Sequence, residues 1–430
     1  MQRITQGDID ALRRRMQLRE ERPASSPPAP QPPQSARKGS TTSTLSRGIE
    51  GTEQVTSLGT FLLQEHFYPN ERSHGSVQIG CLQSLPCDAM HDIVGEQLRS
   101  TDANRWVFLD TETTGLAGGT GTCAFLAGIG MIEEGGFRVQ LYFMRDFDEE
   151  HAMLDALAQT LAQYDTVITF NGKAFDVPLL ETRYRLKRLR NPFRGMDHVD
   201  LLHPSRRLWK ERLGSCRLTN LESHVLGVER QGDIPGALIP QCYFDYLRSG
   251  DGSKLAAVFH HNVLDIVSLA CINSVLLTIL ASPDRTSLRH GQDMHGLARW
   301  LNKLGREGQA LTLYRTAIHS GLPRRDLFAA LWETAQIERR AGRHEEQIQL
   351  LRDLARVSAM HRAAAFVELA KHYEHRLKDY ALALKMTRNA QRHAPSEELC
   401  HRERRILRKL SATAKDGEAE AAAAGADSPG

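Results

Sequence analysis

Strand-like and helix-like segments alternate between residues 51 and 280, and this alternation constrains the fold more than any other feature of the sequence. Strands are predicted at 105–112, 123–144 (a hairpin), 166–172 and 198–202. Helices are predicted at 149–164, 177–190 and 253–280. Strands and helices mixed in this way indicate an α/β domain.

The strand-like segments stop after residue 285, and helix pairs repeat over residues 290–410. Small or apolar residues recur at matching places about 35 residues apart, which resembles the tetratricopeptide repeat. The matching residues are Ala298, Ala335 and Ala370 in the first helix, and Leu311, Ile348 and Leu382 in the second. The sequence therefore predicts an all-α helical-repeat domain that binds a protein partner.

Both ends of the chain are predicted to be disordered. Residues 1–50 include a Pro- and Ser-rich stretch with almost no large apolar residue, and such a stretch cannot bury enough surface to offset its ordering. The tail at 411–430 also looks disordered. Two folded domains remain, at 51–284 and 290–410.

Composition narrows the class of protein without identifying it. The chain has 55 basic and 52 acidic residues, and a net charge of +3 does not by itself indicate nucleic-acid binding. Seven cysteines are scattered without a CxxC pair, which fits a reducing compartment. The N-terminus has no apolar signal region and no continuous apolar run is long enough to span a membrane. We expect a cytoplasmic protein with no membrane partner.

Four carboxylates stand at positions that need an explanation. Asp110 and Glu112 follow an apolar run one residue apart, so strand alternation puts both on one face. Asp176 begins a helix, and Asp265 lies inside an apolar helix, where an unpaired carboxylate is costly. A strand end in solvent, a helix cap and a structural ion pair would explain them separately. A site for two Mg²⁺ or Mn²⁺ ions that hydrolyses phosphodiesters would explain all of them together.

Three segments resemble a known family: DTETTGL from 110, NGKAFDVPLL from 171 and HHNVLDIVSL from 260. They are similar to motifs I, II and III of the DEDD 3′–5′ exonucleases, and in particular to the YprB-like ribonuclease-H-like domain group, which the block at 197–227 also resembles. The resemblance implies a ribonuclease-H-like mixed sheet flanked by helices at 51–284, with the four carboxylates as metal ligands. It also implies 3′–5′ exonuclease activity. The alternative is a non-catalytic nucleic-acid-binding or scaffold protein on a degenerate nuclease fold.

The general base is predicted to be one of two adjacent histidines. In the family, one branch places His five residues before the last Asp, and the other places Tyr four before it; this chain has His260 and His261 at those positions. If the helix already includes residue 260, His261 lies about 40° from Asp265 around the helix axis and His260 about 140° away. If residue 260 is still in a loop, His260 can reach the site instead. Either imidazole can accept a proton near neutral pH.

Residues near the acids are candidates for nucleic-acid binding. Basic residues with an interleaved aromatic suit phosphates and stacked bases of a single strand or a 3′ end. A solvated helix face is the alternative for such a charge run. The candidates are Thr111, Asn171, Arg183, Arg206, Arg207 and Trp209.

Overall fold

The computed structural model describes residues 49–115, 121–285, 288–358 and 360–426, with side chains through residue 413. The chain divides into two compact units between residues 287 and 288. This division lies between residue 284, where the first predicted domain ends, and residue 290, where the second begins. The predicted disordered segment at 1–50 lies outside the described residues, apart from its last two positions.

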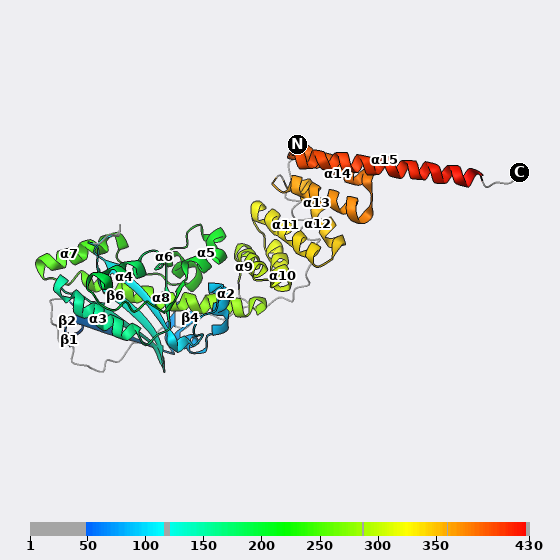
Figure 1. The fold of residues 1–430 in the computed structure, drawn as a ribbon. Coiled ribbons are helices and arrows are strands. Elements are labelled where there is room, and N and C mark those ends of the chain that lie inside the picture. Colours follow the sequence, from blue (N-terminus) through cyan, green and yellow to red (C-terminus); the bar gives the residue numbers. More distant parts are fainter. Residues whose placement is uncertain (1–48, 116–120, 286–287, 359, 427–430) are drawn as a thin grey trace. The chain divides into compact units, whose positions relative to one another are not determined.

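A seven-stranded mixed sheet forms the centre of the first unit (Figure 1). The strands are β1 (Thr52–Thr56), β2 (Gly59–Pro69), β5 (Trp106–Thr113), β6 (Ala124–Glu133), β7 (Gly136–Phe143), β8 (Thr166–Thr169) and β9 (Asp197–Asp200). Their spatial order is β1-β2-β7-β6-β5-β8-β9, antiparallel from β1 to β5 and parallel from β5 to β9. β3 (Ser73–His74) and β4 (Val77–Gln78) pair separately. The mixed sheet confirms the predicted α/β fold class.

β5 lies inside this sheet, between β6 and β8. Its first four residues, from Trp106 to Leu109, are buried, and its last four, from Asp110 to Thr113, are partly exposed. β5 and β8 are parallel, so their carboxyl ends lie at the same edge of the sheet. The polar end of β5 and the turn after β8 therefore meet.

Helices cover both faces of the sheet. The helices of this unit are α2 (Met90–Val94), α3 (Glu150–Leu161), α4 (Asp176–Leu186), α5 (Leu202–Leu213), α6 (Leu218–Leu221), α7 (Ile239–Ser249) and α8 (Leu255–Ala281). Neighbouring residues on β7 show which faces α3 and α8 cover, because they point to opposite sides. The Tyr142 hydroxyl lies 2.7 Å from Thr160 Oγ1 on α3, whereas Leu141 points to the side where Asn262 of α8 lies. Thus α3 and α8 pack on opposite faces.

Two glycines let α8 approach the sheet closely. A Cβ at Gly128 of β6 would lie 1.9 Å from Asn262 Oδ1, and a Cβ at Gly130 would lie 2.5 Å from Ile266 Cγ2. Positions 128 and 130 share a face of the strand, and positions 262 and 266 are one turn apart on the helix. A larger residue at position 128 or 130 would clash with these side chains and disturb the packing of α8, which carries Asp265, on the sheet.

α8 is also long and apolar enough to cross a membrane by length and composition alone. However, 78% of its most apolar window is buried within the protein. The residues buried along α8 lie all around the helix, as in the core helix of a folded domain.

The second unit is all-α. Its helices are α9 (Gly291–Lys303), α10 (Glu307–His319), α11 (Arg324–Arg340), α12 (His344–Val357), α13 (Arg362–His372), α14 (Tyr380–His393) and α15 (Glu397–Ala426). α9 packs on α10, α11 on α12 and α13 on α14, and each pair contacts the next. Ala298, Ala335 and Ala370 are fully buried, as small residues between packed helices should be. The helical C-terminal region is confirmed; its assignment to the tetratricopeptide class stays a prediction.

Two expectations for this unit are wrong. Leu382 is 37% exposed, whereas its predicted equivalents Leu311 and Ile348 are buried, because Ala383 and Leu384 form the inner face of α14 instead. The tail predicted to be disordered at 411–430 continues α15 as far as Ala426. Its Ala- and Glu-rich composition favours a helix.

Candidate active site

Asp110 and Glu112 lie on the face of the sheet that α8 covers. The side-chain amide of Asn262 on α8 donates a hydrogen bond to Asp110 Oδ2 at 2.8 Å. Glu112, two residues further along β5, has its Oε1 atom 3.9 Å from Nε2 of His261. Antiparallel pairing puts Gly128 directly opposite Asp110. The missing side chain at Gly128 leaves the space that Asn262 fills between strand and helix.

Asp176 comes to the same place from the parallel strand β8. It is the first residue of α4, and its Oδ1 atom accepts hydrogen bonds from the Thr111 amide at 3.1 Å and hydroxyl at 2.6 Å. The turn before it is held by Asp200, whose carboxylate accepts from the amides of Asn171 at 2.8 Å and Lys173 at 3.1 Å. Thr111 lies on the strand that carries the first two acids, and its hydrogen bonds hold the third acid, Asp176, beside them.

Asp265 and His261 lie one turn apart on α8. The helix begins at Leu255, so residue 260 is already helical, and His261 rather than His260 lies on the same side of the helix as Asp265. His261 Nε2 lies 3.4 Å from Asp265 Oδ2. One ligand atom from each of Glu112, His261 and Asp265 lies within 4.8 Å of the other two, close enough to surround an ion. The structure thus brings together β5, the start of α4 and α8, three segments far apart in the sequence.

A buried arginine, Arg230, borders this cluster and was not predicted. Its guanidinium is 6% exposed and makes a bidentate pair with Glu222, with N–O distances of 2.6 and 2.7 Å. It also contacts Asp265 Oδ1 and donates to Asp233 Oδ2 at 3.1 Å. Asp233 in turn accepts from His261 Nδ1 at 2.7 Å. Arg230 and Asp233 lie in a loop that has no periodic apolar pattern. Only the charges of the ERQGD stretch at 229–233 could have indicated them from the sequence.

Burial raises the pKa values of all four acids, and repulsion from other acids of the site adds to the shifts of Asp110 and Glu112. Burial raises the pKa of Asp110 well above its ordinary value, and the negative charges of Asp265 and Asp176 raise it further. The same causes raise the pKa of Glu112 well above its ordinary value. Burial also raises the pKa values of Asp176 and Asp265, although Thr111 and Arg230 respectively oppose the shift. Arg230 supplies one positive charge against these four acids.

Asp233 differs from these acids. Burial raises its pKa, but the hydrogen bonds and charges of His261 and Arg230 together outweigh that effect, so the net shift is downward. Asp233 is therefore held as a carboxylate beside the imidazole.

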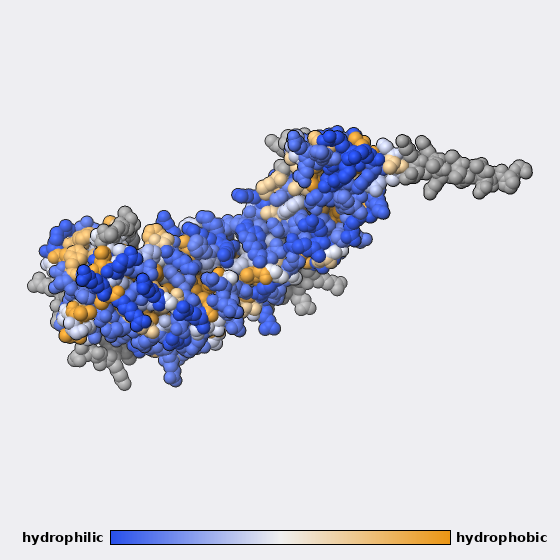
Figure 2. All heavy atoms as spheres, in the orientation of Figure 1, coloured by the Kyte–Doolittle hydropathy of each residue, from blue (hydrophilic) through white to orange (hydrophobic). Residues whose placement is uncertain are grey.

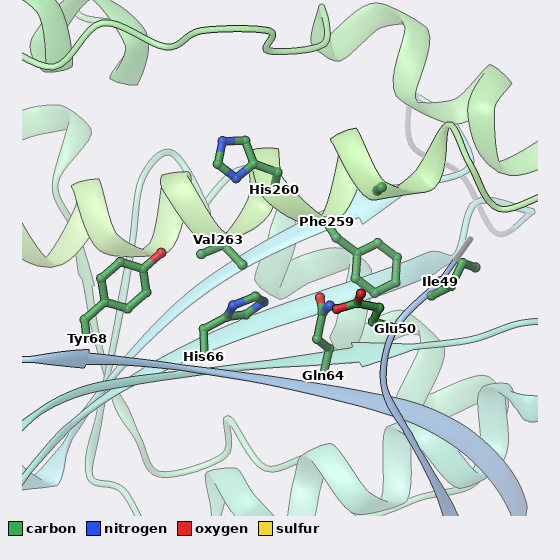
Figure 3. Close-up of a pocket in the computed structure, with 9 residues that line it drawn as sticks. Ile49, Glu50, Gln64, His66, Tyr68, Phe259, His260 and Val263 are labelled. Carbon is green, nitrogen blue, oxygen red and sulfur yellow. The ribbon is translucent and has the colours of Figure 1, made fainter. Parts of the chain in front are cut away.

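His260 faces a different part of the domain. It lines a pocket between α8 and β2, together with Gln64, His66 and Tyr68 (Figure 3). The two histidines thus lie on different faces of α8, and His261 is the one beside the acids. Their catalytic roles stay predictions.

Three of the residues predicted to contact nucleic acid have structural roles within the domain instead. Arg183 pairs with buried Glu150 through N–O distances of 2.5 and 2.7 Å, and the Thr111 hydroxyl is used by Asp176. Asn171 adopts a left-handed conformation, with φ of 67°, in the turn before Asp176. These three residues shape the domain around the acids.

The basic cluster on α5 needs one correction. Trp209 is 1% exposed, so its ring is not available to stack on a base. It lies on the apolar stripe of α5 with Leu208, and that stripe turns towards the core. Arg206 and Arg207 on the same helix are exposed. An exposed aromatic does stand beside the acids: Phe175 directly precedes Asp176 and is 59% exposed.

Further apolar surface lies nearby in the sequence. Figure 2 shows hydrophobic side chains over the end of the domain that carries α7, where Leu238 and Phe244 are 53% and 36% exposed. α7 follows the Asp233 loop in the chain after one short 3-10 turn, Gly236–Leu238.

Comparison with known proteins decides the family. Residues 107–277 match the family model of the RNase_H superfamily. The chain is also 30% identical over 331 residues to "Uncharacterized protein YprB" of Bacillus subtilis (strain 168), across 76% of this chain and 79% of that protein. The chain belongs to the YprB family. The RNase H-like segment of this YprB-family protein contains the four acids and His261, and it places the protein in a nuclease superfamily.

A more distant likeness is to a solved structure, the family B DNA polymerase from the hyperthermophilic archaeon Pyrobaculum calidifontis. The TM-score is 0.31 with 11% sequence identity, over 61% of this chain and 50% of that chain. A likeness this weak says nothing about the activity of the YprB-family protein.

The residues of the site fit divalent metal ions. Hard cations such as Mg²⁺ and Mn²⁺ prefer several carboxylate oxygens, and the site offers Asp110, Glu112, Asp176 and Asp265. Bound cations would also relieve the repulsion that raises the pKa values of these acids. The donor set and its electrostatics therefore agree with the resemblance to metal-dependent nucleases.

Proposed function

We propose that this protein is a metal-dependent 3′–5′ exonuclease that hydrolyses nucleic-acid phosphodiesters by a two-metal mechanism. The observation that carries the proposal is the convergence of four acids from three segments around one point. Asp176 is tied to β5 through Thr111, and Asp110 is tied to α8 through Asn262. A structural role alone does not explain why four buried acids gather around the single positive charge of Arg230.

In this mechanism Asp110, Glu112, Asp176 and Asp265 hold the cations. Two divalent cations, when bound, activate the attacking water and stabilise the departing 3′ oxygen. Thr111 and Asn262 fix the acids from opposite sides, so the site is held in shape before substrate arrives.

His261 is the proposed general base. Its Nε2 atom faces Glu112 and Asp265 at 3.9 and 3.4 Å, where a water must lose its proton. His260, on the pocket side of α8, has no part in this step.

The proposed substrate is a single strand or a free 3′ end. Exposed Arg206 and Arg207 are suited to its phosphates, and exposed Phe175, beside Asp176, is suited to stack on a terminal base. Both DNA and RNA offer these phosphates and bases.

We further propose that the helical unit binds a protein partner. Large apolar side chains are exposed on it, including Met360 at 58% and Leu377 at 60%. Exposed apolar side chains on a helical-repeat surface suit a protein partner better than a polyanion.

The test is a digestion assay on single-stranded DNA and RNA oligonucleotides with Mg²⁺ or Mn²⁺. The wild-type protein should release nucleotides, whereas Asp265→Asn should release none and keep its fold by circular dichroism. Binding of oligonucleotide without release under either metal would instead support the non-catalytic alternative.

A further inference from the structure

The contact between Asp233 and His261 gives the imidazole a defined orientation. Asp233 Oδ1 lies 2.7 Å from His261 Nδ1, while Nε2 on the other side of the ring faces Asp265 and Glu112. A carboxylate can only accept a hydrogen bond, so the proton between these two atoms belongs to Nδ1. The lone pair of the neutral ring is then on Nε2, towards the acids.

We propose that Asp233 is a positioning residue that fixes the Nδ1–H tautomer of His261 and so aims its basic nitrogen at the reaction centre. The inference rests on the proposed function, because it assigns a partner to the base of that reaction. Asp233 lies in the loop before α7, outside the three motif segments, so the proposed site includes a fourth segment of the chain.

Arg230 also lies within reach of His261 Nδ1, the nitrogen that contacts Asp233. Its Nη1 atom lies 3.3 Å from His261 Nδ1, and a guanidinium can only donate. The Asp233 contact is 0.6 Å shorter (3.3 against 2.7 Å) and joins a carboxylate to a ring N–H. The same Nη1 donates to Asp233 Oδ2 at 3.1 Å. Arg230 therefore supports Asp233 in its place and does not take the imidazole nitrogen.

Asp233 is itself held on both oxygens. Its Oδ1 atom also accepts from the Ile234 amide at 2.9 Å, and its Oδ2 atom from Arg230. Arg230 is anchored by Glu222, which is 1% exposed. A carboxylate fixed at both oxygens presents a constant direction to the imidazole, which a flexible surface acid could not do.

Asp233→Asn should expose this role. An amide of the same shape can donate to Nδ1, which favours the tautomer with the proton on Nε2 and removes the base. We expect kcat to fall by roughly 10²–10⁴-fold, as for loss of a general base, with KM within about threefold of wild type. Asp245→Asn is the matched control, since Asp245 pairs only with the exposed cations Arg248 and Lys254 among the charged residues described and should leave both constants unchanged.

The second measurement is the protonation state of His261 in the wild-type full chain. Nitrogen-15 spectra of histidine-labelled protein at pH 8, with and without Mg²⁺, should show Nδ1 of His261 protonated and Nε2 unprotonated in both. His261→Gln identifies the resonance by its absence. This reading does not depend on turnover, so it tests the inference even if the wild-type protein hydrolyses nothing and the proposed function fails.

Each outcome either supports or overturns the positioning role of Asp233. A protonated Nδ1 together with a selective loss of kcat in Asp233→Asn supports the positioning role. An active wild-type protein whose Asp233→Asn variant keeps its kcat overturns it, and so does a wild-type Nδ1 without a proton. If Asp233→Asn does not fold, the nitrogen-15 reading of the wild-type chain decides alone.

Discussion

Asn262 donates a hydrogen bond to Asp110 at 2.8 Å, joining the core helix to the first acid of the site across 152 positions of the chain. Asn262 is fully buried, and its Oδ1 atom has no protein hydrogen-bond partner among the described residues. It can hold this position because Gly128, opposite Asp110 on the neighbouring strand, has no side chain. The spacing between helix and sheet therefore sets the geometry of the acids.

Gly128→Ala should damage the site without a change to any acid. The new Cβ would lie 1.9 Å from Asn262 Oδ1, so α8 or Asn262 has to move and the Asp110 contact is lost. We expect turnover to fall at least about 10-fold and stability to fall by about 1–3 kcal/mol, as in overpacked cores. Nuclease assays and urea unfolding measure both. Gly308→Ala, on helix α10 where a Cβ meets nothing within 4 Å, should leave turnover unchanged and should not lower stability, because Ala favours a helix over Gly; equal losses in the two variants would contradict this account.

The acids should make the metal-free protein less stable as pH rises. Their pKa values are raised in the folded state, so the folded chain binds protons more tightly than the unfolded chain, whose carboxyls titrate near pH 4. The contribution of these four acids to stability in EDTA should therefore decline from pH 4 upwards, through the raised folded values. Asp110→Asn should have a higher melting temperature than wild type in EDTA at pH 8.

Metal should reverse this effect in the wild-type protein only. Mg²⁺ should raise the wild-type melting temperature at pH 8 by mass action, and it should do so much less in Asp110→Asn. Asp245→Asn, a change at an exposed ion pair, should behave like wild type in both conditions. A wild-type protein that does not respond to Mg²⁺ or Mn²⁺ would count against a metal site.

Arg230 and Glu222 should be coupled in stability. Arg230→Met leaves Glu222 buried without its partner and should cost about 3–5 kcal/mol in the free energy of unfolding. The double variant Arg230→Met with Glu222→Gln should recover part of that loss. Arg248→Met, at a pair that is 68% exposed on the arginine side, should cost no more than about 1 kcal/mol. Additive effects in the cycle would show that the pair is not coupled.

The two adjacent histidines should differ sharply. His261→Ala should lower kcat by about 10²–10⁴-fold with little change in KM, because its Nε2 faces the acids. His260→Ala should change little, because it lines the pocket on another face of α8. A large loss only at His260 would move the base to the other position, and small equal losses would leave the reaction without a histidine base.

Much of the fold could be predicted from local patterns. The strands at 105–112 and 166–172 and the long helix from 253 follow from apolar periodicity, which depends only on neighbouring residues. The grouping of Asp110, Glu112, Asp176 and Asp265 was predicted from two sources: the cost of leaving such acids unpaired, and the resemblance of their three segments to nuclease motifs. Sequence could predict which acids gather.

Sequence could not predict what holds them. Gly128 is important because of its register opposite Asp110, and register is a long-range property. Arg230 and Asp233 lie in a loop, where no periodicity signals burial. Trp209 was misplaced because the charges around it suggested an exposed face, while the stripe that it shares with Leu208 is the buried one.

The most direct test of the central claim is the pattern of products from a 5′-labelled single-stranded oligonucleotide with Mg²⁺ or Mn²⁺. The account predicts a ladder that shortens one nucleotide at a time from the 3′ end, needs the metal, and is absent for Asp110→Asn. Internal cuts, immediate release of the 5′ label as a mononucleotide, or products that form equally with Asp110→Asn would contradict it.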